Sequence, residues 1–396
     1  MIAIVFLRNR FREPINFYVI LILIKFEVQI GLEGFLKNST PKTSKTKLLM
    51  KFEAVTIKDI AKALGLSTST VSRALRDSYE ISPETKKIVL EYAKEINYRP
   101  NPIALSLKEK RSRSIGIVVS EIANSFFSQA INGMESVANS NGYNVIITQS
   151  HESYEREISN LQFLSSRSVD GCLLSVSTET KDFTHITDLH DRGMHIVCFD
   201  RLVEGMETHK VFVDSFKGAY NATTHLIKNG YKRIGHLSNS EYLSITKERL
   251  AGYTKALEDN KIDYDETLVQ QCMHGGMIYD EVEDAMNKLM KMKQKPDAIF
   301  ASADKLTTNC MRYCKAKKIK IPDDVAVIGF SNLDLTELLS PSLSVVRQPA
   351  FEMGRIAAEL LIKMIEAKRA TTDFETIMLP AEVFERESSA RKKAKK

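Results

Sequence analysis

The spacing of apolar residues changes along the chain and divides it into a short helical part and a long mixed part. Between residues 56 and 96, apolar side chains recur three or four positions apart, which predicts short amphipathic helices. From residue 114 onward, short apolar runs alternate with amphipathic stretches, which predicts repeated strand–helix units. We therefore expect a small all-α domain followed by a larger α/β domain.

The strand–helix alternation predicts parallel sheets with helices on both faces. The predicted strands are 115–120, 143–148, 171–175, 196–200, 233–238, 298–301 and 325–330, and the helices are 127–141, 217–229, 247–259, 281–292 and 305–318. This part is longer than one such sheet usually needs, so we expect two doubly wound lobes with a ligand cleft between them. The first lobe is assigned to about 114–213 and 346–375, and the second to about 214–345 and 376–389.

Helix-ending and helix-starting residues set the limits of the small domain. Thr56 and Asp59 fit a capping box at the start of its first helix, and Gly65 allows the turn that ends it. Ser67 is placed to cap a second, short helix that turns Val71 inward. A third helix is expected from Ser82 and Pro83 to about Ile96.

The outward face of the second helix is made of small hydroxyl groups and one guanidinium. Its members are Thr68, Ser69, Thr70, Ser72 and Arg73. A helix in the major groove needs such a face, because hydroxyls can contact phosphates and base edges and arginine can bind guanine with two hydrogen bonds. Residues 50–99 are therefore predicted to form a helix-turn-helix domain. A generic three-helix bundle with a solvated polar helix is the alternative.

Charge is distributed unevenly between the two parts. Residues 50–114 hold 13 Lys and Arg against 8 Asp and Glu, whereas 115–389 carry a net charge of −9 in a chain of net +6. A basic N-terminal part on an acidic body is typical of a nucleic-acid-binding domain attached to a domain that does not bind nucleic acid.

Composition argues against an enzyme, a metal site or a disulfide framework. The five cysteines are scattered, and the pair Cys310 and Cys314 has no second Cys or His pair nearby to complete a zinc site. The chain has no HExxH, GxSxG or glycine-rich phosphate-loop motif, and its eight histidines show no metal spacing. We expect no cofactor, and buried, reduced thiols in a cytoplasmic protein.

Residues 1–49 are predicted to be a disordered or non-native N-terminal extension. The apolar run 15–24 has about half the length of a membrane-spanning helix, and no convincing cleavage site follows it. A weak membrane anchor is the minority interpretation. Residues 390–396 are expected to form a disordered basic tail.

Three segments resemble the lactose-repressor (LacI/GalR) family of bacterial transcription regulators: TIKDIAKALGLSTSTVSRAL, ISPETKK and NYRPNPIALSL. The similarity extends from Thr56 to about Ser389. It implies a type I periplasmic-binding-protein fold for residues 114–389. It also implies that Thr68, Ser69 and Arg73 contact bases, while phosphates are held by Thr56, Thr70, Ser72, Ser82 and Thr85.

The linker 100–113 contains a short apolar segment between prolines and a basic stretch. A helix of one or two turns is marginal in water, so this segment should fold only when a partner orders it. The resemblance implies a hinge helix that enters the minor groove with Ala104, Leu107 and Lys108. Leu107 would then act as an apolar wedge between base pairs. Packing of Leu107 against the body is the alternative.

The same resemblance places effector-binding residues at the predicted cleft. These are Phe126, Phe127, Asp200, Arg201, Arg249, Asp304 and Ser331. Three of them have a plainer alternative: a core pair for the two phenylalanines, a surface ion pair near Glu248 for Arg249, and helix capping for Asp304. Ser331 stands where the family usually has an aspartate, so the class of ligand stays open.

The sequence therefore predicts a DNA-binding regulator, most simply a repressor, that binds a palindromic operator in double-stranded DNA as a dimer. A small effector, expected to be a sugar or sugar derivative, would set the operator affinity by moving the lobes. A tetramer is left open, and no membrane partner is expected. The alternative is a sugar-binding protein or sensor without a role in gene regulation.

Overall fold

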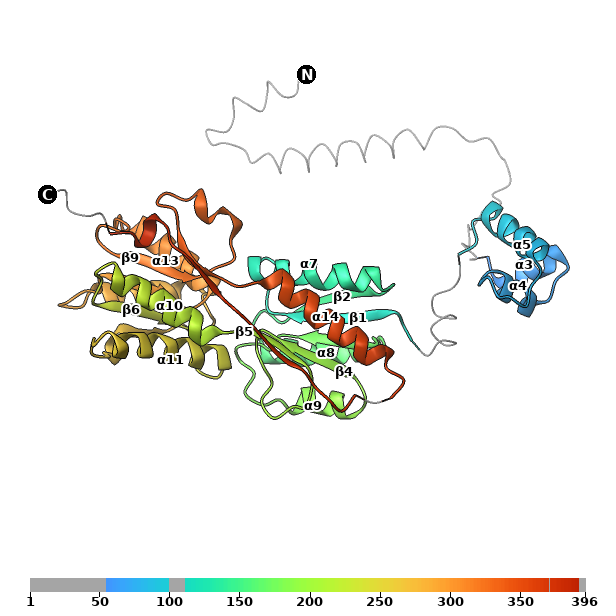
Figure 1. The fold of residues 1–396 in the computed structure, drawn as a ribbon, viewed down its shortest axis with the longest axis horizontal. Helices are drawn as coiled ribbons and strands as arrows, with labels where there is room; N and C mark the ends of the chain where they lie inside the picture. The colour runs from blue at the N-terminus through green and yellow to red at the C-terminus, as the bar shows by residue number, and fades with distance from the viewer. Residues whose placement is uncertain (1–54, 100–110, 370, 392–396) are drawn as a thin grey trace, which may run out of the picture. The chain divides into compact units, whose positions relative to one another are not determined.

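The computed structural model describes residues 55–99, 111–369 and 371–391. The chain forms two compact units, which divide between Arg99 and Pro100 (Figure 1). The predicted extension 1–49, the hinge residues Ala104, Leu107 and Lys108, and the tail beyond residue 391 lie outside the described residues.

The first unit contains the three predicted helices, which are α3 (Ile57–Leu64), α4 (Thr68–Ala74) and α5 (Pro83–Glu95). Their apolar faces meet in one small core formed by Ile60, Ala61, Val71, Ala74, Val89 and Ala93. Gly65 ends α3 with a φ of 63°, a left-handed conformation that glycine adopts without a steric penalty. The prediction of a helical domain is confirmed.

The first lobe of the second unit is built on a six-stranded sheet in the order β11-β5-β4-β3-β1-β2. All its strand pairs are parallel. The strands are β1 (Ser114–Val119), β2 (Asn144–Gln149), β3 (Gly171–Leu174), β4 (His195–Phe199), β5 (Lys210–Val213) and β11 (Thr376–Leu379). The helices that contact this sheet or one another are α7 (Ser125–Ser140), α8 (Tyr154–Ser166), α9 (Thr184–Asp191) and α14 (Ala350–Glu366).

The second lobe has a six-stranded sheet in the order β12-β10-β9-β8-β6-β7, in which only β12 runs antiparallel to its neighbour. The strands are β6 (Ile234–Ser238), β7 (Val269–Gln271), β8 (Ala298–Ala301), β9 (Ala326–Phe330), β10 (Ser344–Arg347) and β12 (Glu382–Phe384). Its helices are α10 (Ser215–Lys228), α11 (Ser244–Asp259), α12 (Tyr279–Met290) and α13 (Asp304–Ala316). The prediction of two doubly wound lobes is confirmed.

The chain crosses between the lobes three times: from β5 to α10, from β10 to α14, and from β11 to β12. The sequence assigned 376–389 to the second lobe, but β11 pairs with β5 and belongs to the first sheet. Likewise, β10 begins at Ser344 and lies wholly in the second sheet, so the first lobe resumes with α14. Pro380, which cannot donate a backbone hydrogen bond, separates β11 from β12.

Close helix packing holds each lobe together, and Figure 1 shows α7 beside α14 and α10 beside α11. A Cβ atom on Gly133 would lie 2.1 Å from the carbonyl oxygen of Phe351, and one on Gly354 would lie 2.0 Å from that of Ala130. Such distances are impossible for a real side chain, so glycine is required where α7 meets α14. No helix in the described part of the chain is long and apolar enough to cross a membrane.

Candidate DNA-binding surface and ligand cleft

The start of α4 is organised by the hydroxyl of Ser67. Its Oγ accepts a hydrogen bond of 3.0 Å from the amide of Thr70, and it lies 2.7 Å from the Oγ of Ser69 and 2.8 Å from the Oγ1 of Thr70. Thr68 and Ser69 are exposed beside it. Arg73 of the predicted polar face is exposed as well, whereas Thr70 and Ser72 are half-buried, so the face is open mainly at Thr68, Ser69 and Arg73. It lies at a capped helix start that can approach phosphate groups.

Arg73 lies on the same face and is held by a single carboxylate. Its Nη1 is 3.1 Å from Oε2 of Glu80, and the two side chains are 54% and 45% exposed. Ser72 is engaged differently, because its hydroxyl accepts a hydrogen bond of 2.7 Å from Nη2 of Arg76. Sequence reasoning missed both Glu80 and Arg76, which lie outside the α4 motif.

The hydroxyls predicted to hold phosphates cap two further helices. The Oγ1 of Thr56 donates to Oδ2 of Asp59 over 2.7 Å, and the Oγ of Ser82 accepts from the amide of Thr85 over 3.3 Å. The hydrogen bonds from the hydroxyl and the amide of Thr56 hold the pKa of the Asp59 carboxyl below its ordinary value. The groups therefore mark the positive ends of α3 and α5, where anions are favoured.

In the second unit, Arg249 of α11 is enclosed. It is only 4% exposed, and its Nη1 donates to the carbonyl oxygen of Ser302 over 2.5 Å. Its Nε lies 3.3 Å from the hydroxyl of Ser215, and its guanidinium carbon is 3.8 Å from the ring centroid of Phe330. Burial lowers its pKa to about 10, against the attraction of Asp200. The alternative of a surface ion pair is wrong.

Asp200 follows β4 in a left-handed conformation with a φ of 61°. It is 6% exposed, and burial raises the pKa of its carboxyl although the charges of Arg201 and Arg249 act in the opposite direction. Asp200 of the first lobe and Arg249 of the second lobe therefore influence each other electrostatically across the cleft.

Arg201 makes its strong contacts within the first lobe. Its Nη1 and Nη2 bind the two carboxylate oxygens of Glu152 over 2.7 and 2.9 Å, and Nη1 also donates to the carbonyl oxygen of Val176 over 2.8 Å. Burial alone would raise the pKa of Glu152, but the charge and hydrogen bonds of Arg201 lower it below the ordinary value. Glu152, which sequence reasoning missed, thus fixes the guanidinium.

Phe126 and Phe127 start α7 and belong to the hydrophobic core of the first lobe. They are 5% and 3% exposed, and their ring centroids lie 5.2 Å apart in an edge-to-face arrangement. Phe127 makes a second such contact with Phe199, at 6.4 Å. The core pair weighed from the sequence is present, and stacking of these rings on a ligand stays a prediction.

Asp304 is not a helix cap. Ala303 occupies the N-cap position of α13, and the Asp304 carboxylate accepts a hydrogen bond from the hydroxyl of Ser331. Burial raises the pKa of this carboxyl. The site therefore still contains a carboxylate next to Ser331, and Asp304 supplies it.

Buried hydroxyl groups gather where strands of both sheets end. They belong to Ser150 after β2, Ser175 after β3, Ser240 after β6 and Ser302 after β8, and none has a hydrogen-bond partner among the described residues. Carboxyl ends of parallel strands form the usual ligand-binding edge of such sheets. These hydroxyls are suited to a polar ligand or to ordered water.

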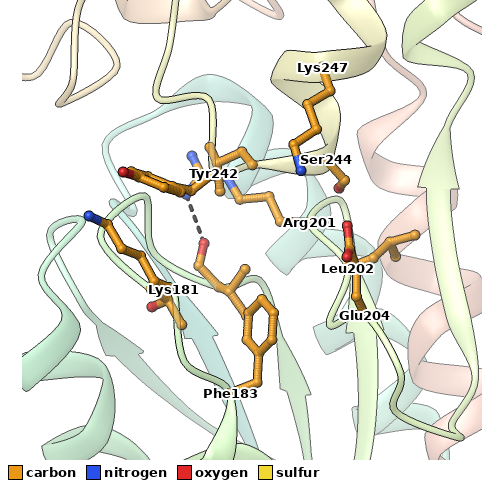
Figure 2. A pocket seen from close by; sticks show the side chains of 11 residues that line it. Lys181, Phe183, Arg201, Leu202, Glu204, Tyr242, Ser244 and Lys247 are labelled. Carbon is orange, nitrogen blue, oxygen red and sulfur yellow. Dashed lines mark hydrogen bonds between the residues drawn. The ribbon is translucent and has the colours of Figure 1, made fainter.

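A cavity of about 180 Å³ opens between the lobes (Figure 2). It is lined by Val176, Thr180, Lys181, Phe183, Arg201, Leu202 and Glu204 of the first lobe and by Tyr242, Leu243, Ser244 and Lys247 of the second. Only Arg201 of this set was predicted. The others lie in loops and in the first turn of α11, where no residue pattern marks a cleft.

Direct contacts hold the two lobes against each other. Two hydrogen bonds join Gln129 in α7 to Asn332 after β9. Gln129 Nε2 donates to the backbone carbonyl oxygen of Asn332 over 3.1 Å, and Asn332 Nδ2 donates to Gln129 Oε1 over 2.8 Å. An ion pair of 3.2 Å joins Lys305 to Glu121. Asn332 also accepts from the amide of Gln348, at the crossing that leads into α14.

The geometry defines a class of protein: a small helical domain with an exposed polar helix, followed by a two-lobe ligand-binding domain. Comparisons with known proteins agree with both parts. Residues 56–101 match the family model described as bacterial regulatory proteins, lacI family, and residues 223–389 match the periplasmic binding protein-like domain. Among the described residues, no group of three or more His, Cys, Asp and Glu is placed to hold a metal ion.

Relatives and solved structures extend this result. The chain is 33% identical over 313 residues to the HTH-type transcriptional repressor PurR of Vibrio atlanticus, covering 79% of this chain and 92% of that protein. It is 28% identical to catabolite control protein A of Priestia megaterium, over 85% and 99% of the two chains. The chain belongs to the lacI family of bacterial regulatory proteins, so it is a DNA-binding transcription regulator with an effector-binding domain and not an enzyme.

Two solved structures resemble the fold over most of this chain. The regulator CelR in complex with cellobiose is 29% identical with a TM-score of 0.62, covering 84% of this chain and 99% of that one. The lac repressor dimer bound to operator and anti-inducer has a TM-score of 0.71 over 86% of this chain and 100% of that one. At 20% identity, the second likeness bears on the fold alone.

Proposed function

We propose that this regulator acts as a repressor that binds a palindromic operator as a dimer, with a small hydroxyl-rich effector setting its operator affinity. The exposed, capped polar face of α4 carries this proposal, because it has the side chains that a major-groove helix needs. A two-fold dimer would present two such helices to the two half-sites of a palindrome.

The DNA contacts are divided by chemistry. Thr68, Ser69 and Arg73 contact base edges, and phosphates are held by Thr56, Thr70, Ser72, Ser82 and Thr85. Arg73 exchanges Glu80 for DNA on binding, since their exposed pair is weak in water. Ala104, Leu107 and Lys108 enter the minor groove, with Leu107 as the wedge.

The effector occupies the cleft at the carboxyl ends of the strands. Asp200, Arg249, Asp304 and Ser331 bind it directly, Phe126 and Phe127 border it, and Arg201 supports Asp200. The unpartnered hydroxyls after β2, β3, β6 and β8 favour a ligand rich in hydroxyl groups, such as a sugar. The complex of CelR with cellobiose is a precedent among similar proteins.

Movement of the lobes reaches the DNA-binding domain through the end of the linker. Asp170, which precedes β3, accepts hydrogen bonds from the amides of Ser112 and Arg113 over 2.7 and 2.9 Å. Arg111 donates to the carbonyl oxygen of Ile365 near the end of α14 over 2.8 Å. The linker therefore leaves from the first lobe, and effector and operator affinities are coupled in both directions.

The test is a thermal-shift screen of sugars and nucleobases on the full chain, followed by operator binding with each ligand found. A ligand that raises the unfolding temperature should also change operator affinity by about fivefold or more. A ligand that binds tightly and leaves operator affinity unchanged would contradict this proposal.

That contrary result would favour the second candidate, a sugar-binding sensor without a regulatory role. The residue composition of α4 argues against it, because a sensor has no need for an exposed helix of hydroxyls and arginine. A regulator of this kind acts where the chromosome is, so we place it in the cytoplasm. Measurements of molecular mass in solution decide between a dimer and a tetramer.

A further inference from the structure

The cavity in Figure 2 carries more positive than negative charge. Three cationic side chains line it, those of Lys181, Lys247 and Arg201, against the single carboxylate of Glu204. Arg201 already has a partner in Glu152. In the described parts of the chain, neither lysine nitrogen has a carboxylate oxygen within 4.0 Å. The two ammonium groups are therefore the uncompensated charges of this cavity.

The two lysines belong to different lobes. Lys181 lies between β3 and α9 of the first lobe, whereas Lys247 lies in the first turn of α11 of the second. The Nζ of Lys181 is 4.0 Å from the ring centroid of Tyr242, so it faces the second lobe. Like charges on opposite walls of a cleft oppose its closure, and an anion between them favours closure.

The start of α11 adds backbone amide groups, which are hydrogen-bond donors at the positive end of the helix. This helix has 16 residues, and its N-cap Leu243 offers no side-chain hydrogen bond to the first amide groups. Leu243 and Ser244 both line the cavity. Amide groups at the positive end of a helix are free to bind an anion when no side chain caps them.

We propose that the effector is an anionic sugar derivative whose phosphate or carboxylate group binds between Lys181 and Lys247. Its hydroxyl groups face Asp200 and Arg249. This inference rests on the proposed function and names the chemical class of the effector. The cavity of about 180 Å³ holds the volume of about six water molecules, which is room for a phosphate group and part of one sugar ring.

Inorganic phosphate is the first probe, because it does not require the sugar to be known. The unfolding temperature of the full chain is measured in phosphate and in chloride at equal pH and ionic strength. The double variant Lys181→Gln/Lys247→Gln should bind phosphate at least about tenfold more weakly than the wild type. The control Lys255→Gln changes a lysine of the same helix that is paired with Glu258 and Asp259, and it should behave as wild type.

An equal effect of phosphate on the wild type and the double variant would overturn the proposal and mark phosphate as an adventitious ion only. A second set of measurements compares hexoses with their 6-phosphates and uronates. An anionic member should bind about tenfold more tightly than its neutral parent, and the double variant should lose this preference. Whether phosphates or uronates are preferred identifies the anionic group.

Failure of this inference is distinguishable from failure of the proposed function. In one outcome, a neutral sugar binds equally to the wild type and the double variant, its binding depends on Arg249, and it changes operator affinity. In that case the proposed function stands and the anionic class is wrong. If the lysines bind phosphate but no ligand changes operator affinity, the anion subsite stands and the regulatory proposal is wrong.

Discussion

The DNA-binding domain and the ligand cleft are assembled over very different distances along the chain. In the first unit, the side-chain contacts at the proposed site join near neighbours, such as Thr56 with Asp59 and Arg73 with Glu80. In the cleft, Ser331 meets Asp304 from 27 positions away and Asn332 meets Gln129 from 203. One site depends on local sequence, whereas the other depends on topology.

The arginines of the two sites differ in the same way. Arg73 is half exposed and holds one exposed carboxylate, an arrangement that contributes little to stability because water screens it. Arg249 is buried against Phe330 and the carbonyl oxygen of Ser302, close enough to Asp200 to affect its charge. The first arginine can exchange its partner for DNA, and the second is fixed before the ligand arrives.

The largest expected effect is that of Arg249→Ala. Removing this cation takes away a positive charge that offsets the buried negative charge of Asp200. The variant should therefore lose about 3 kcal/mol of unfolding free energy. It should also lose the stabilisation given by any effector. Urea unfolding with and without ligand measures both quantities, and a variant that unfolds like the wild type would show that Arg249 is not the enclosed charge described here.

Arg73→Ala tests the exposed site. Loss of a guanidinium that contacts a base should weaken specific operator binding by about 2 kcal/mol, roughly thirtyfold, while unfolding stability changes little. Fluorescence anisotropy with labelled duplexes measures the affinity. Lys94→Ala removes a charge from the last turn of α5 and is the matched control. Equal losses in the two variants would mean that only overall charge matters.

Acid should destabilise the effector-binding domain by protonating buried His236. Its ring stacks on Tyr253 and on Phe300, at centroid distances of 5.0 and 4.9 Å, and burial lowers its pKa from 6.5 to about 4. Because the unfolded chain takes up this proton more readily, the contribution of neutral His236 is complete above pH 6.5 and is lost as the pH falls toward 4. The loss should be about 1 kcal/mol for each pH unit.

Urea unfolding at pH 7 and pH 5.5 measures this dependence. His236→Phe keeps an aromatic ring in the stack and removes the titrating group, so its stability should depend less on pH than that of the wild type. The same pH dependence in both proteins would assign the acid sensitivity to other groups.

The smallest expected effect is that of Glu80→Gln. Without this carboxylate, no ion pair has to be broken before Arg73 contacts DNA. Operator affinity should therefore rise about twofold at low salt. The gain should disappear at high salt, where exposed charges are screened. A fall in affinity would indicate that Glu80 positions Arg73 for DNA.

The same contrast explains what the sequence could and could not predict. Helix caps and apolar spacing located α3, α4 and α5, and the strand–helix alternation located most central strands. The short strands β5, β7 and β10 were missed, as were the helices α8, α9 and α14. The α14 helix is amphipathic, with Glu352, Arg355, Glu359 and Lys363 recurring three or four positions apart, so its omission was an error of interpretation and not a lack of pattern.

For the cleft, residue identity was predictable but the partner was not. Arg201 was assigned to the ligand, and the structure gives it Glu152, which lies 49 positions earlier. Asp304 was weighed as a cap, and it instead meets Ser331. Lys181 and Lys247 were missed altogether, because the cavity that they share exists only once two lobes pack together.

A selection from random-sequence duplexes with the purified full chain tests the regulator proposal most directly, with Arg73→Ala run in parallel. The wild type should enrich one palindromic sequence, and the variant should enrich none or a sequence relaxed at the positions that Arg73 contacts. If the wild type, with and without candidate sugars and sugar phosphates, enriches no duplex over the starting pool, the proposed role of α4 is wrong.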